Sequence, residues 1–213
     1  MKLVKKIALL LMILTIPLCM TSCKKYDIEN IGTISIIDDE IENYPDVIAE
    51  VEYASDFLPA LSDLSDYTNI RYSYRKRYYS LLFFLPMFVS EDVTLFVEYP
   101  DDIYEDKKTQ VLDSYEFLEA TIISEDGKNY QSAPATFEYG EYDFRTTALP
   151  DSLNSMVYMT KSFAFIGVND DKNRIAFCYF YDIDLDTMGS TEQSEQEMIT
   201  EFIDDYFDWN DLP

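Results

Sequence analysis

The chain has 213 residues, of which 41 are Asp or Glu, 16 are Lys or Arg and none is His, giving a formal net charge of −25 at pH 7. Such acidity argues against a nucleic-acid partner, because phosphate contacts are made by Lys and Arg. The lack of histidine excludes nucleophilic catalysis with a histidine base and zinc sites with imidazole ligands. The five glycines form no phosphate-binding loop.

The first 22 residues have the pattern of an export signal. Lys2, Lys5 and Lys6 give a positively charged start, and a mainly apolar stretch follows over residues 7–18. This stretch is too short to cross a bilayer, which needs about 20 apolar residues. We therefore expect residues 1–22 to be a signal peptide that is removed on export.

The signal segment ends in Met20, Thr21, Ser22 and Cys23, which resemble the lipobox of bacterial prolipoproteins. Met20 departs from the family pattern, in which Leu is usual at that place. The resemblance implies lipid attachment at Cys23 and a location on the extracytoplasmic face of the cell membrane, or at the outer membrane of a Gram-negative cell. The alternatives are an ordinary signal peptide and an uncleaved anchor.

Removal of the signal leaves a chain long enough for one domain. We expect residues 23–32 to be a lipidated tether and residues 33–213 to be one acidic domain, with the net charge going from −25 to −28 when the three signal lysines are lost. Only Cys178 then remains beside Cys23, so no disulfide forms within the chain. Because Cys178 lies in an expected strand between aromatic residues, we interpret it as a small buried hydrophobe.

The spacing of apolar residues and the turn signals predict the secondary structure. In chain order, the predicted elements are a strand over 33–37, a helix from Pro45 to about 55 (a stretch that also fits a strand), a loop over 57–69, strands over 70–74, 81–89 and 93–99, a helix from Asp101 or Asp102 to about 118, a hairpin at Asp126-Gly127, an alternating segment over 136–146 with a bulge at Gly140, a hairpin of 162–168 with 174–185, and a final helix with a capping box at Ser190 or Ser194. This order predicts a single α+β domain, with an antiparallel sheet of about six to eight strands and two or three helices packed on one face.

Two segments of the expected domain resemble uncharacterised surface lipoproteins of Gram-positive anaerobes. They are LFVEYPDDIYEDKK at 95–108 and IAFCYFYDIDLD at 175–186. The resemblance agrees with a lipid-anchored surface protein and implies no particular function and no site residue.

Asp182, Asp184 and Asp186 resemble the start of a calcium loop, D-x-D-x-D. However, Thr187 stands where such a loop needs Gly, and Gln193 stands where a bidentate acid is expected. We therefore favour a solvated strand edge or turn, and expect no metal and no cofactor, with calcium at these three aspartates as the alternative.

The aromatic residues have two interpretations. The 18 Tyr and 14 Phe could line a groove for a glycan or peptide, or could fill the core of a sheet. We favour the core. The run from Tyr78 to Leu85 could likewise dip into the membrane, although a buried central strand is the favoured interpretation.

Arg71, Arg75, Lys76 and Arg77 form a basic cluster in this acidic chain. The cluster could meet a carboxylate ligand or an acidic partner. The favoured alternative is pairing with the protein's own acids, or charge protection of an edge strand.

We expect a membrane-tethered, non-catalytic binding module whose partner is a small molecule, a glycan or an envelope protein, and this predicts an aromatic-lined cleft on the sheet. A structural or interaction protein of the envelope is the first alternative, and predicts an apolar patch of several hundred Å². A carboxylate-based hydrolase is the second, and predicts two acids about 5–10 Å apart in a cleft, one with a raised pKa.

Overall fold

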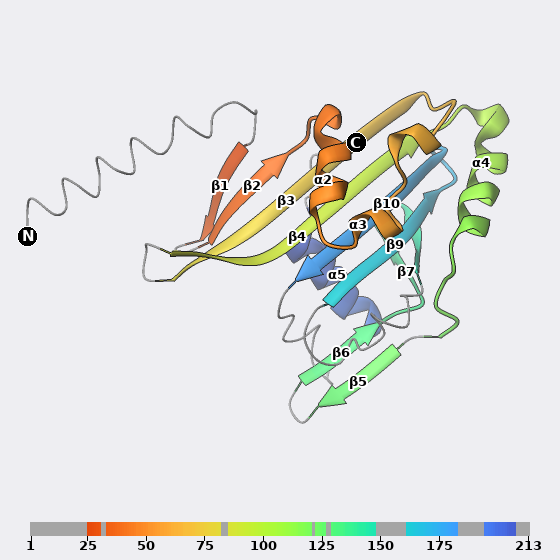
Figure 1. Ribbon diagram of the computed structural model, residues 1–213. Coiled ribbons are helices and arrows are strands. Elements are labelled where there is room, and N and C mark those ends of the chain that lie inside the picture. The colour runs from red at the N-terminus through yellow and green to blue at the C-terminus, as the bar shows by residue number, and fades with distance from the viewer. Residues whose placement is uncertain are drawn as a thin grey trace, which may run out of the picture.

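The computed structural model describes residues 25–30, 33–81, 85–120, 122–126, 129–147, 161–182 and 194–207. An eight-stranded sheet dominates it, with the strand order β1-β2-β3-β4-β10-β9-β8-β7, and all neighbouring strands are antiparallel (Figure 1). Strands β5 and β6 form a separate hairpin. The strands are β1 (Lys25–Asn30), β2 (Thr33–Asp38), β3 (Asn69–Leu81), β4 (Leu85–Glu98), β5 (Ile122–Asp126), β6 (Asn129–Ala133), β7 (Thr136–Tyr139), β8 (Tyr142–Thr146), β9 (Lys161–Asn169) and β10 (Arg174–Asp182).

The described residues also form four α-helices, one more than the two or three expected. They are α2 (Tyr44–Glu50), α3 (Ala54–Phe57), α4 (Asp101–Ser114) and α5 (Glu195–Tyr206), with short 3-10 turns at Ile41–Asn43 and Leu61–Asp63. The α+β class and the antiparallel sheet predicted from the sequence are confirmed.

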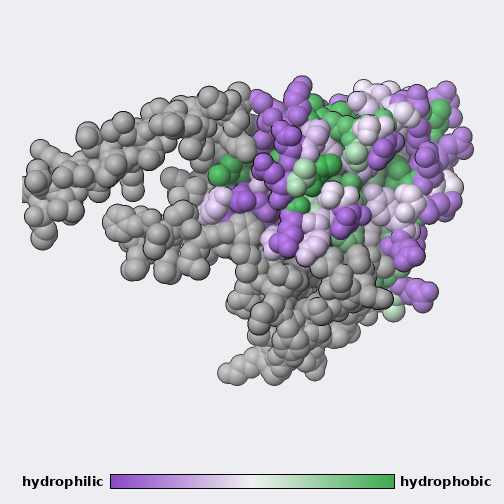
Figure 2. Space-filling view, in the orientation of Figure 1, coloured by the Kyte–Doolittle hydropathy of each residue, from purple (hydrophilic) through white to green (hydrophobic). Residues whose placement is uncertain are grey.

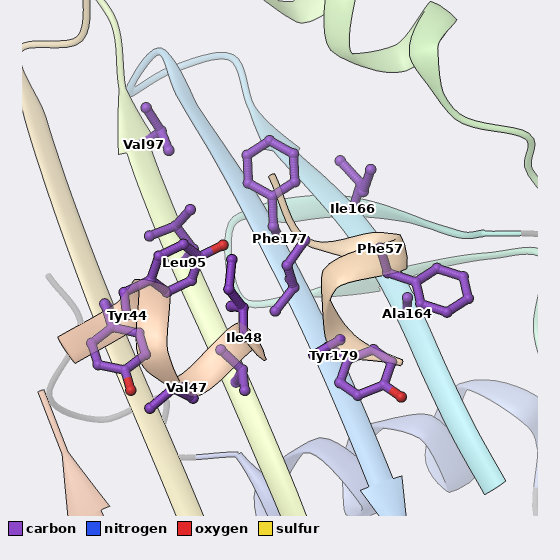
Figure 3. Packing of buried hydrophobic residues seen from close by; sticks show 14 of the residues in the cluster. Tyr44, Val47, Ile48, Phe57, Leu95, Val97, Ala164, Ile166, Phe177 and Tyr179 are labelled. Carbon is purple, nitrogen blue, oxygen red and sulfur yellow. The ribbon is translucent and has the colours of Figure 1, made fainter. Parts of the chain in front are cut away.

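One face of the sheet packs against α2 and α3. Figure 3 shows Ile48 of α2 and Phe57 of α3 lying above strand residues such as Phe177 and Tyr179. The ring of Phe57 stacks on that of Tyr179 with centroids 5.7 Å apart. This core fixes the chain that follows α3, because Leu58 is buried in the same cluster.

The opposite face packs against α5, which corrects the expectation that the helices lie on one face. The ring of Phe202 meets that of Phe180 edge-on, with centroids 4.8 Å apart. The reason lies in β10, where both alternating sets of side chains are buried, one in each core. Strands buried on both faces have nearly continuous apolar sequences, as β10 does.

Strands β3 and β4 form one long hairpin, which corrects the expected division into three strands. Their register runs from Asn69 paired with Glu98 to Leu81 paired with Leu85. The apolar run that was expected to form one strand is thus divided between the end of β3 and the start of β4. No Gly or Asn marks the reversal, so the hydrophobic pattern could not reveal it.

Other corrections concern the ends of elements. Residues 25–30, expected to be tether, are strand β1 and pair with β2. Gly140 lies in the turn between β7 and β8 instead of a bulge, with a φ of 60° that glycine adopts without steric cost. Helix α4 is preceded by Pro100 at its N-cap instead of an aspartate, and it ends at Ser114.

The start of α5 confirms one of the two predicted capping boxes. The backbone N–H of Glu197 donates to Ser194 Oγ over 3.3 Å, and the N–H of Ser194 donates to the Glu197 carboxylate over 2.9 Å. This reciprocal pair satisfies two amide groups that a helix N-terminus leaves without partners.

Candidate functional site

A hollow of about 410 Å³ lies beneath α4, at the end of the sheet where β4 and β10 meet the segment after α3. We call it the α4 groove. It is lined from α4 and the residue after it by Lys107, Gln110, Val111, Ser114 and Tyr115, from the facing segment by residues 56–59 and 63–65, and from the sheet side by Tyr99 and Phe177. Its volume falls within the range of about 300–1,000 Å³ that small-molecule sites occupy.

The wall opposite α4 is anchored by the core and by two tyrosine hydroxyls. Tyr44 Oη donates to the carbonyl of Pro59 over 2.8 Å, and Tyr115 Oη donates to the carbonyl of Phe57 over 2.9 Å. Tyr44 is buried in the apolar cluster, and Tyr115 is partly buried against it. The wall is therefore held in a fixed position relative to the sheet.

Helix α4 itself is held mainly by polar contacts, because Tyr104 is the only residue of the helix that is fully buried. Tyr104 Oη and Lys108 Nζ both donate to Asp170 Oδ1, over 2.7 and 2.9 Å. Asp170 lies in the turn between β9 and β10. The helix is therefore fixed by polar contacts to a turn at one end of the sheet's inner strands, and its remaining apolar residues pack only partly against the core.

The inner part of the groove is aromatic. Phe177 and Tyr99 are 1% and 3% exposed, and the Tyr115 ring lies 6.4 Å from the Phe177 ring, centroid to centroid. Burial, helped by the carboxylate of Asp63, raises the pKa of Tyr115 to about 12. Burial and the charge of Asp66 raise the pKa of Tyr99. Both phenols are therefore neutral at physiological pH.

The rim of the groove is charged. Lys107 Nζ donates to Ser65 Oγ over 2.8 Å and to Asp66 Oδ2 over 3.2 Å. The hydroxyl of Ser65, and then the ammonium of Lys107, hold the pKa of Asp66 below its ordinary value. Asp56 and Asp63 are the exposed carboxylates of the lining itself. Figure 2 shows one face of the molecule, on which hydrophobic residues form small areas between hydrophilic ones.

A second hollow, of about 860 Å³, lies against β7 and β8. Its wall includes the outer edge of β7, where the Gln196 side chain donates to the carbonyl of Glu138 over 2.7 Å and accepts from its N–H over 3.4 Å. A side-chain amide thus occupies backbone groups that an edge strand leaves open. The α4 groove is the more enclosed of the two hollows, so we regard it as the better candidate.

The basic cluster of β3 pairs with the protein's own acids at two of its positions. Lys76 pairs with Glu91, while Arg77 lies 3.4 Å from Asp92 and donates to the backbone carbonyl of Asp205 over 2.9 Å. Arg77 and Asp92 are both almost completely buried. The favoured interpretation, internal pairing, is confirmed for these two residues. The edge-strand alternative is wrong, because β3 lies inside the sheet.

The remaining basic residues of the cluster, Arg71 and Arg75, lie on β3 as well, and Arg71 is exposed. The four basic residues therefore do not converge on a single ligand site: Lys76 and Arg77 come from successive positions of a strand and point to opposite faces. Neither contributes to the α4 groove.

The structure describes one of the three aspartates of the predicted calcium loop. Asp182 is the last residue of β10, whereas Asp184 and Asp186 lie outside the described residues, as does Cys23. In the described ranges, no three Asp, Glu or Cys residues come together in a way that could hold a metal ion. The same ranges contain no helix long and apolar enough to cross a membrane.

The aromatic residues of the sheet belong mainly to the two cores, as the favoured interpretation predicted. Cys178 is 1% exposed, and burial raises the pKa of its thiol, so its interpretation as a buried hydrophobe is confirmed. The run from Tyr78 to Leu85 is split between β3 and β4, and residues 82–84 within it lie outside the described residues.

The hydrolase alternative calls for a carboxyl group with a raised pKa. Asp66, Glu141, Asp170 and Glu197 are the described carboxyl groups with a resolved shift, and in all four the pKa is lowered by hydrogen bonds from lysine, tyrosine or serine groups. None of these four therefore has the property expected of a general acid.

No family model, no curated protein and no solved structure matches the chain. None of the residues that line the α4 groove was predicted from the sequence to be a site residue. The one available signal was the pair Lys107 and Lys108, two cations in a helix otherwise rich in acids.

Proposed function

We propose that the protein is a lipid-anchored, extracytoplasmic binding module without catalytic activity, and that its ligand enters the α4 groove. The anchor rests on the signal segment and on the lipobox residues that end in Cys23. The binding function rests on one observation, the preformed hollow of about 410 Å³ beneath α4. Protein interiors are normally packed to the density of organic crystals, so a hollow of this size beside a core gives up stabilising contacts.

The composition of the groove supports the same proposal. Ligand sites combine an apolar lining with a few polar groups that fix the orientation of the ligand. Here Tyr99, Phe177 and Val111 provide the apolar part, and Gln110 and Asp63 are exposed polar groups beside it. An envelope scaffold would instead present an apolar patch; the exposed large hydrophobics of the described residues are Tyr53 and Tyr67.

The binding proposal can be tested by filling the groove. Gln110 lines it, whereas Thr109 is exposed on α4 and does not. We therefore compare Gln110→Trp with the matched control Thr109→Trp in a thermal-shift screen of amino acids, short peptides, oligosaccharides and amines. Compounds that raise the Tm of the wild type and of Thr109→Trp should have no effect on Gln110→Trp. If the hits stabilise all three proteins equally, the groove is not the binding site.

The anchor can be tested with the two cysteines of the leader region. Cys23→Ser should abolish incorporation of a labelled fatty acid and release the protein from the membrane fraction, while Cys19→Ser should change neither. Retention of label in the Cys23→Ser protein would contradict the proposed attachment point.

A further inference from the structure

We infer that the α4 groove selects a ligand with an ammonium or guanidinium group on an apolar stem. This inference rests on the proposed binding function and adds the chemical class of the ligand. Free amines and the side chains of Lys or Arg in a peptide share this chemistry.

Lys107 is the one basic residue of the groove lining. The ammonium group of Lys107 is already engaged, because its Nζ bonds to Ser65 Oγ and Asp66 Oδ2. Its positive charge is thus offset by a carboxylate that lies outside the lining. An anionic ligand would have to displace this pairing to gain a counter-charge.

The lining contains two acidic residues, Asp56 and Asp63. Among the described residues, the Asp56 carboxylate has no hydrogen-bond or ion-pair partner, and that of Asp63 accepts only from the neighbouring Ser62 hydroxyl over 3.3 Å. Both side chains belong to exposed residues on the wall opposite α4. Because Asp66 neutralises Lys107, the charges of Asp56 and Asp63 make the electrostatic potential at the groove negative. The groove therefore repels anionic ligands and attracts cationic ones.

The negative potential extends to the aromatic part of the groove. Asp63 lies close enough to Tyr115 for its charge to add to the rise in the pKa of Tyr115 that burial causes. A cation in the groove would therefore be favoured at its aromatic side as well as at its rim.

The aromatic rings of the groove can also contact a cation. Lys107 Nζ lies 5.9 Å from the centroid of the Tyr99 ring, within the range of cation–π contacts. The groove therefore already places one ammonium group over one of its rings. Tyr115 offers further ring surface, and Val111 offers aliphatic surface, for the stem of a ligand, because both side chains are only half-buried.

Three probes of nearly equal shape test the inference on the mature chain: 2-phenylethylamine, 2-phenylethanol and phenylacetate. Their dissociation constants are measured at low ionic strength from the shifts of backbone amide signals in α4 and residues 56–65. We expect the amine to bind about tenfold more tightly than the alcohol, from two exposed carboxylates and one cation–π contact, and phenylacetate to bind most weakly. Physiological salt should weaken the amine alone.

Single substitutions assign the effect to the two carboxylates. Asp56→Asn and Asp63→Asn should each weaken the amine by about two- to fivefold, the usual range for exposed ion pairs, and leave the alcohol unchanged. Asp113→Asn is the matched control, because Asp113 is an exposed acid of α4 that does not line the groove. It should change the affinity for the amine by less than twofold.

The outcomes separate this inference from the proposed function. If amine and alcohol bind equally well and Gln110→Trp abolishes both, the groove is a binding site without charge selection, and the inference is wrong. If phenylacetate binds best, or if none of the probes shifts the groove amides at about 10 mM, the inference is also wrong, while the thermal-shift screen still decides whether the groove binds anything. A blocked tripeptide containing Arg or Lys, compared with the free amine, shows which source of the cation fits better.

Discussion

Gly167 offers a sharp test of the packing on the face covered by α5, because two physical effects predict opposite signs for its replacement. Gly167 lies in β9 between Ala176 of β10 and Phe144 of β8. A Cβ atom built at this position would lie 2.7 Å from both Cδ1 and Cζ of Phe144 and closer still to Cε1. Ordinary carbon contacts begin near 3.5 Å, so either the ring or the strand would have to move.

The Phe144 ring cannot easily yield. It is 1% exposed, stacks on Phe137 with centroids 5.1 Å apart and meets Phe165 edge-on at 5.5 Å. Overpacking of a core costs about 1–3 kcal/mol, whereas replacing glycine by alanine inside a strand gains roughly 0.5–1 kcal/mol of backbone entropy. We therefore expect Gly167→Ala to lower the free energy of unfolding by about 1–2 kcal/mol.

Urea denaturation measures the effect, with Phe144→Leu as the second background. If the ring causes the cost, Gly167→Ala should lose most of its penalty in that background, and the coupling between the two substitutions should exceed about 0.5 kcal/mol. The reasoning is refuted if Gly167→Ala stabilises the wild-type domain, or if its cost is the same in both backgrounds.

Three further predictions concern the N-cap of α5, the contacts of Asp170 with α4 and the buried thiol of Cys178. Ser194→Ala should lower the free energy of unfolding, measured in urea, by about 1 kcal/mol. The amide and hydroxyl of Ser194 lower the pKa of Glu197, so their stabilisation is present above the ordinary carboxyl pKa and disappears as the pH falls through the lowered pKa. The variant should therefore lose less stability in acid than the wild type does. Asp170→Asn should speed amide hydrogen exchange in α4 at neutral pH, and because Lys108 and the Tyr104 hydroxyl lower the pKa of Asp170, the wild type should approach the variant only in strong acid. In the mature chain with Cys23→Ser, Cys178 should react with iodoacetamide at pH 8 only on the time scale of unfolding, as followed by mass spectrometry, since burial raises the pKa of its thiol.

The elements that the sequence predicted best are those in which pattern and turn chemistry agree. The second hairpin was expected over 162–168 and 174–185, and β9 and β10 cover Lys161–Asn169 and Arg174–Asp182. Between them stands a polar turn in which Asn173 adopts a φ of 52°, a conformation that Asn tolerates. Two apolar runs and a residue suited to positive φ in the polar segment between them thus gave the same boundary.

The elements predicted worst are those that depend on contacts between distant segments. Residues 25–30 contain charged and polar residues and no strong strand pattern, yet they form β1 because the outer edge of β2 offers backbone partners. The side of the sheet on which α5 packs was misjudged for a different reason. The signal was present in the unbroken apolar sequence of β10, but a short apolar run fits a strand covered on both faces and a buried helix equally well.

The α4 groove was beyond prediction because two segments about fifty residues apart must meet to form it. The sequence nevertheless contained its physical cause. In the sequence of α4, Lys108 stands between Tyr104 and Val111 at the spacing of one helix face. Only Tyr104 is fully buried, while Lys108 donates to Asp170. A helix with so few apolar residues on one face does not pack tightly on the sheet, because burying that face would stabilise it only a little. The space left beneath it is the groove, so the poor amphipathicity of a helix that is nonetheless tied in place is the sequence feature from which this site arises.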